Sequence, residues 1–181
     1  KIPFFRKDLI KDNYHGLSQN LSKIYTKFDN KIIFAPSMAS GINFKPTDTQ
    51  SIESTLYELN KYILKNKKTL IIVKEKKGEL ENINQNIKNI IYNSNNFFVI
   101  RSLKPKLIPY NQFEELLPFS NLLITLTSTS TTILQSLDKN IPFICVNDNH
   151  PLSFYADYKN CEINLKNLNN AIEYWLKIDK F

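Results

Sequence analysis

A run of six hydroxyl side chains is the feature of this sequence best suited to hold an anion. Residues 127–132 read TSTSTT and directly follow the apolar stretch 122–126. A helix predicted over 130–138 begins inside the run, where free backbone N–H groups and the helix dipole favour a phosphate. The alternative is that one hydroxyl caps the helix and the others face water. Position after a buried strand favours the phosphate site, with candidate ligands Thr127, Ser128, Thr129, Ser130 and Thr131.

Two basic residues follow other apolar runs in the same way. Lys74 comes after the second run and Arg101 after the third. A lysine contacts phosphate as a point charge, whereas an arginine binds phosphate or carboxylate through two parallel hydrogen bonds. Lys74 has the alternative of a surface position at a strand end, and Arg101 that of an ion pair with Glu114 or Glu115. Both are candidate ligands of an anionic substrate.

Several common sites are missing from the sequence. It contains neither GxGxxG nor GxxxxGK[ST], which disfavours ordinary dinucleotide-binding and P-loop proteins. Two cysteines and two histidines match no zinc spacing, so we expect neither a metal nor a cofactor. Cys145 and Cys161 are interpreted as reduced structural thiols, and we expect a cytoplasmic location. The net charge of +7 is carried by dispersed lysines without a nucleic-acid-binding motif, so we expect no nucleic acid partner.

The hydrophobic pattern alternates between short apolar runs and amphipathic stretches. Continuous apolar runs predict strands buried on both faces, and stretches with apolar residues every three to four positions predict helices. Strands are predicted at 31–35, 69–73, 97–100, 122–126 and 142–146, with a short sixth at 162–165. Helices are predicted at 50–65, 79–93, 111–118, 130–138 and 167–178. This order predicts an α/β fold, a Rossmann-like doubly wound parallel sheet of five to six strands with helices on both faces.

Two segments make up the chain in this interpretation. Residues 1–30 form a lead-in helical segment, and residues 31–181 form the Rossmann-like domain. Ligands of such sheets bind beyond the carboxyl ends of the strands. That rule selects the loops after each predicted strand, including 147–154, where His150 is a candidate substrate contact. A solvated or capping role is the alternative for His150.

Residues 119–146, FSNLLITLTSTSTTILQSLDKNIPFICV, resemble the late segment of the second domain of GT-B glycosyltransferases. In that family a strand leads into a small or hydroxyl-rich turn, then a helix with an "EAL" pattern, then "gkPvI". The chain has the hydroxyl run, then 135–137 (QSL), then 140–144 (NIPFI). Enzymes of bacterial capsule and other surface polysaccharide synthesis are the most similar. The resemblance extends over residues 31–178.

The resemblance implies a nucleotide-sugar donor as substrate and roles for particular residues. The loop after the first strand, with Ser37, Ser40 and Gly41, would approach the diphosphate. Gln135 stands where the family commonly has a glutamate that holds the ribose hydroxyls, so it would bond them without charge. Asn140 replaces the usual glycine and must make the turn, which Asn tolerates better than most residues.

A catalytic base for an acceptor hydroxyl is not recognisable in the chain. In GT-B enzymes the base usually comes from the first domain, so the resemblance implies a missing N-terminal acceptor domain or partner subunit. It also implies a peripheral contact with the inner membrane. Two other hypotheses remain: a nucleotide-sugar 2-epimerase-like domain, and a non-catalytic GT-B-like domain with an assembly or regulatory role.

Overall fold

The computed structural model describes residues 24–36, 49–75, 78–101, 116–126, 131–146 and 161–178, with only the backbone described at Arg101 and Thr131. Its strands are β1 (Asn30–Ala35), β2 (Thr69–Glu75), β3 (Phe97–Arg101), β4 (Leu122–Thr125), β5 (Phe143–Val146) and β6 (Glu162–Ile163). Its helices are α2 (Thr49–Lys65), α3 (Gln85–Asn93), α5 (Thr131–Asp138) and α6 (Leu168–Ile178), with 3-10 turns η2 (Leu117–Phe119) and η4 (Leu165–Asn167).

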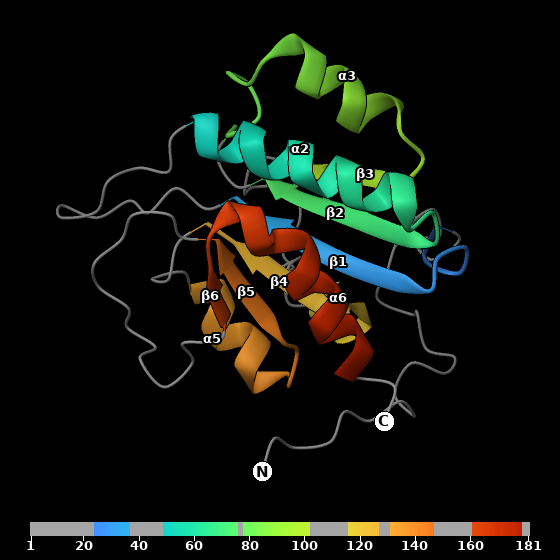
Figure 1. The fold of residues 1–181 in the computed structure, drawn as a ribbon, viewed down its shortest axis with the longest axis vertical. Coiled ribbons are helices and arrows are strands. Elements are labelled where there is room, and N and C mark those ends of the chain that lie inside the picture. Colours follow the sequence, from blue (N-terminus) through green and yellow to red (C-terminus); the bar gives the residue numbers. More distant parts are fainter. Residues whose placement is uncertain are drawn as a thin grey trace, which may run out of the picture.

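Six strands form one sheet in the order β3-β2-β1-β4-β5-β6, and each neighbouring pair is parallel. The central strands β1, β2, β4 and β5 are almost wholly buried, because helices cover both faces and leave no polar side to the sheet. Figure 1 shows α2 and α6 lying across the strands. The predicted fold class, a doubly wound parallel α/β sheet, is confirmed.

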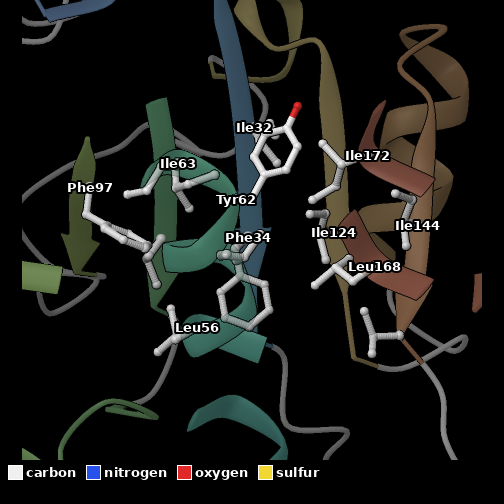
Figure 2. Close-up of a cluster of buried hydrophobic side chains, with 14 of the residues drawn as sticks. Ile32, Phe34, Leu56, Tyr62, Ile63, Phe97, Ile124, Ile144, Leu168 and Ile172 are labelled. Carbon is white, nitrogen blue, oxygen red and sulfur yellow. The ribbon is translucent and has the colours of Figure 1, made fainter. Parts of the chain in front are cut away.

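A separate hydrophobic core lies on each face of the sheet. On one face Ile32, Phe34 and Ile124 contact side chains of α2, α3 and α6 (Figure 2). On the other face Ile33 and Leu123 contact α5 through Ile133. Alternate residues of a strand point to opposite faces, so one apolar run supplies both cores.

The helix predicted over 79–93 begins six residues later than expected. It starts at Gln85, because the side chain of Asn84 accepts a hydrogen bond of 2.8 Å from the backbone N–H of Asn86 and caps the helix there. Gly78 has a φ of 81°, which turns the chain after β2. The backbone N–H of Leu80 then donates to Glu75 Oε1 at 3.1 Å instead of entering a helix.

Other predicted elements differ from the structure mainly at their ends. The second strand runs on to Glu75, and the sixth stops at Ile163 because Leu165 enters η4. Of the helix predicted over 111–118, only the last three residues lie in the described part, where η2 stands. Of the lead-in segment, residues 24–30 are described, and Tyr25 is fully buried in the α5-side core. The division of the chain at residue 31 stays a prediction.

Candidate functional site

The direction in which successive strands are added to the sheet reverses between β1 and β4. The chain runs from β1 outward to β2 and β3, then returns to β4 and continues to β6 on the other side. At the carboxyl ends of the two central strands, Ala35 is the register partner of Thr125. Ligands of open α/β sheets bind in the crevice at such a reversal. The candidate site is therefore the carboxyl edge around β1 and β4.

Both loops that leave this point lie outside the described residues. The same holds for the loop after β5. The predicted ligands in these loops are Ser37, Ser40, Gly41, Thr127, Ser128, Thr129, Ser130 and His150, all outside the described part of the chain. Their roles stay predictions.

Helix α5 begins close to the reversal, five residues after Leu126. Thr131 is its first residue, and the first turn contains no acidic side chain. The positive end of the helix dipole is therefore not neutralised by a carboxylate of its own first turn. Gln135, which is half-buried, follows one turn later on the same side of the helix as Thr131. The structure thus brings these two predicted residues together.

Lys74 and Arg101 stand at the ends of neighbouring strands on the other side of β1, but at positions that alternate between opposite faces of the sheet. Lys74 is the register partner of Ile100, and Arg101 that of Glu75, so the two basic residues occupy neighbouring strands at the same edge. Three strand spacings separate β3 from β4, which is about 14 Å. Lys74 stands on β2, two strand spacings or about 10 Å from β4, so Arg101 is the farther of the two basic residues from the strand that leads into α5.

The surroundings of Lys74 include two carboxylates that sequence reasoning did not single out. Glu75 and Glu79 are only 3% and 5% exposed, although burying a carboxylate costs free energy unless it is hydrogen-bonded or paired. Burial lowers the pKa of Lys74, while the charges of Glu79 and Glu75 act in the opposite direction. A signal was present in the sequence, since Glu75 ends the same strand as the apolar run 70–73.

These carboxylates change the interpretation of the basic candidates. The charge of Lys74 is compensated by Glu79 and Glu75, so a phosphate at Lys74 would have to compete with them. The N-terminus of α5 has no such competitor in its first turn. The first turns of α2 and α5, the helices that follow the two central strands β1 and β4, both lack an acidic residue, so neither presents the competition that a phosphate would meet at Lys74.

The turn after α5 agrees with the prediction for Asn140. This residue has a φ of 54°, in the left-handed region where glycine is usual and Asn is tolerated. Backbone bonds of 3.0 Å from Asn140 N to Leu137 O and 2.8 Å from Ile141 N to Ser136 O close the end of the helix. The chain therefore enters β5 without the glycine of the resembling family.

The two cysteines are free and buried. Burial raises the pKa of Cys145 to about 12 and that of Cys161 to about 11. Thiols held protonated in this way are poor nucleophiles, which agrees with a structural role. Within the described ranges, no three His, Cys, Asp or Glu residues gather as a metal site, and no helix has the length and apolar character to cross a membrane.

Comparison with known proteins shows a shared fold at low sequence identity. No family profile and no curated protein sequence matches the chain. The solved UDP-GlcNAc 2-epimerase of Methanocaldococcus jannaschii aligns with a TM-score of 0.60 at 15% identity, covering 88% of this chain and 43% of that one. A protein described as a UDP-N-acetylglucosamine 2-epimerase from Listeria monocytogenes gives 0.59 at 12%, covering 92% and 40%.

A third solved structure comes from a plant. Os79 from O. sativa, in complex with UDP and deoxynivalenol-3-glucoside, aligns with a TM-score of 0.53 at 9% identity, covering 91% of this chain and 37% of Os79. The chain thus spans about two fifths of the length of each of the three proteins. The common feature is the Rossmann-like sheet, which the chain shares with part of each of these larger proteins.

Proposed function

We propose that this chain is the donor-binding half of a two-domain glycosyltransferase that takes a nucleotide-sugar as substrate in surface polysaccharide synthesis. The observation that carries the proposal is α5, which begins beside the reversal of strand order without an acidic residue in its first turn. The fold shared with UDP-sugar epimerases and with Os79 bound to UDP supports the same ligand class.

The proposed chemistry assigns one task to each part of the site. The N-terminus of α5 and the hydroxyl run would hold the diphosphate and stabilise the charge that develops on it as the sugar departs. Gln135 would bond the ribose hydroxyls. The base for the acceptor would come from a further domain or subunit. Arg101 lies about 14 Å along the sheet from β4, so it would contact a more distant part of the donor.

Isothermal titration of the chain with UDP-, GDP- and CMP-sugars at low salt tests this proposal. One donor nucleotide should bind in preference to the others, and Arg101→Ala should weaken its binding. Lys139→Ala is the matched control, because this exposed lysine follows α5 at its other end and forms an ion pair of 2.9 Å with Asp138. Absence of binding to every donor, with an intact fold by circular dichroism, would refute the donor-binding function and leave the non-catalytic hypothesis.

A 2-epimerase is the second candidate, favoured by the two epimerases among the structural matches. Both functions predict binding of a UDP-sugar, so binding does not separate them. NMR of UDP-N-acetylglucosamine incubated in D₂O with the chain and its partner domain does. Inversion and deuterium uptake at carbon 2 of the sugar would indicate the epimerase. Loss of the sugar to an acceptor, with release of the nucleotide, would indicate the transferase.

A further inference from the structure

The amino-terminal edge of the sheet carries a charged surface that lies outside the proposed donor-binding site. The turn between α2 and β2 lies at the amino-terminal edge of the sheet, opposite the candidate site (Figure 1). Residues 61–68 read KYILKNKK, with four lysines in eight residues. The backbone N–H of Asp29 donates to Lys68 O at 2.9 Å, which brings the turn before β1, including the exposed Lys27, beside this segment. We call this surface the basic edge.

Carboxylates compensate only part of the charge of the basic edge. Lys61 pairs with Glu58 at 2.7 Å, and Lys68 pairs with Asp29 at 3.3 Å across strongly exposed side chains. The basic edge thus contains five lysines and only two paired carboxylates, so its net charge stays positive. The lysines are Lys27, Lys61, Lys65, Lys67 and Lys68. Asn66 and Asn96, which hold this turn through backbone carbonyls, are neutral and do not alter the balance.

An exposed leucine lies in the middle of the lysines. Leu64 is 65% exposed, although its neighbours Tyr62 and Ile63 are buried in the core. Tyr57, two turns earlier on the same side of α2, is 48% exposed, and Lys61 lies 4.5 Å from the centre of its ring. Apolar side chains surrounded by lysines are the composition of surfaces that rest on a lipid headgroup layer.

We propose that the basic edge docks the protein onto an anionic membrane surface. Lysines would lie among acidic headgroups, and Leu64 with Tyr57 would enter the interface. A nucleic acid also attracts lysines, but it offers no apolar environment for a leucine, and the edge has no arginine. The proposal assigns a surface to the membrane contact that the family resemblance implies, and it leaves the carboxyl edge of the sheet facing away from the membrane. Its test needs no donor nucleotide, so its failure and that of the proposed function can be told apart.

Sedimentation of the full chain with lipid vesicles tests the proposal. Vesicles of phosphatidylcholine with 30% phosphatidylglycerol should bind the chain at low salt, and vesicles of pure phosphatidylcholine should not. The double variant Lys65→Gln/Lys67→Gln should lose roughly 30-fold in affinity, since each lysine near an anionic surface contributes about fivefold. Raising the salt to 0.5 M should release the wild type.

Matched controls separate this surface from charge in general. Lys166→Gln removes one exposed lysine from the opposite, carboxyl edge, after β6, and should bind like the wild type, whereas Lys65→Gln alone should lose about fivefold. Leu64→Ser should weaken binding severalfold, whereas Leu134→Ser, an exposed leucine of α5 on the opposite face, should not. Equal losses in the two single lysine variants would overturn the proposal. So would the absence of vesicle binding, or tighter binding of a 20-nucleotide RNA than of the vesicles.

Discussion

Gln135 is the residue whose chemistry decides how well the proposed site can hold a donor. It is half-buried one turn into α5, where the resembling family commonly has a glutamate. A neutral amide bonds ribose hydroxyls less strongly than a carboxylate, because hydrogen bonds to charged groups are roughly twice as strong. The identity of this side chain therefore limits the affinity of the site without abolishing it.

Substitution of Gln135 gives a prediction in both directions. Gln135→Glu should tighten binding of the preferred UDP-, GDP- or CMP-sugar by roughly 10-fold, and Gln135→Ala should weaken it by a similar factor. Titration calorimetry against the donor and its 2′-deoxyribose analogue measures both. The gain in Gln135→Glu should vanish with the deoxy analogue. An unchanged affinity in both variants would remove Gln135 from the site.

The buried thiols predict a loss of stability in alkali. The pKa values of Cys145 and Cys161 are raised to about 12 and about 11, above the ordinary value for a thiol. An unfolded chain therefore releases these protons first, and the stabilisation present at neutral pH is lost as the pH rises from about 9 towards 12. The free energy of unfolding should fall by roughly 1 kcal/mol per pH unit for each thiol in that range.

Denaturation in urea between pH 8 and pH 10.5 measures this slope. The variant Cys145→Val/Cys161→Ala should show a shallower fall, and Tyr62, whose pKa burial also raises to about 12, accounts for part of the remainder. At pH 8 the folded protein should resist iodoacetamide until denaturant is added. Rapid alkylation of the native protein would contradict the buried, protonated state.

Among the elements, the junction of α2, β2 and β3 depends on one asparagine. Asn96 Nδ2 donates to the carbonyls of Lys67 and Thr69, both at 2.8 Å, and Asn96 O accepts from Ile71 N at 2.8 Å. The side chain therefore fixes the start of β2 against the start of β3. A similar side-chain hydrogen bond occurs at β1, where Lys31 N donates to Asn121 Oδ1 at 2.7 Å.

Asn96→Ala should therefore lower the free energy of unfolding by about 1–3 kcal/mol, because two hydrogen bonds are lost and the Thr69 carbonyl is partly buried. Asn95→Ala, one position earlier and exposed, is the control. The urea midpoint should shift in Asn96→Ala at an unchanged slope and stay near the wild type in the control. Equal midpoints in the two variants would show that the junction does not depend on this amide.

The elements themselves were largely predictable, since buried parallel strands read as unbroken apolar runs such as FICV in β5. The start of α3 was not, because periodicity alone cannot show that Asn84 caps the helix or that Leu80 N bonds Glu75. At the site, the position of α5 followed from the pattern. The burial of Glu75 and Glu79 did not, because burial depends on which distant segments cover a strand end.

At the scale of the whole molecule, the two edges of the sheet have different characters. The carboxyl edge contains the reversal between β1 and β4 and the start of α5, whereas the amino edge contains the lysines around Leu64. Because every strand is parallel, the two surfaces lie at opposite ends of the domain (Figure 1). Substrate binding and surface docking can therefore be altered independently, which makes the variants of one edge controls for the other.

The single sheet also predicts that both faces unfold together. The only tryptophan, Trp175 in α6, packs against both cores and lies 5.5 Å from Tyr174 between ring centres. Each core rests on the same six strands, so the loss of one face exposes the sheet that supports the other. Tryptophan fluorescence and far-ultraviolet circular dichroism should therefore give coincident urea transitions.

Core substitutions on the two faces make this prediction specific. Leu56→Ala in α2 and Ile133→Ala in α5 remove fully buried side chains from opposite faces. Each should lower the free energy of unfolding by about 2–5 kcal/mol and shift both probes by the same amount. If Ile133→Ala moved only the circular dichroism transition, the α5 face would unfold as a separate unit. The sheet would then not couple the two faces.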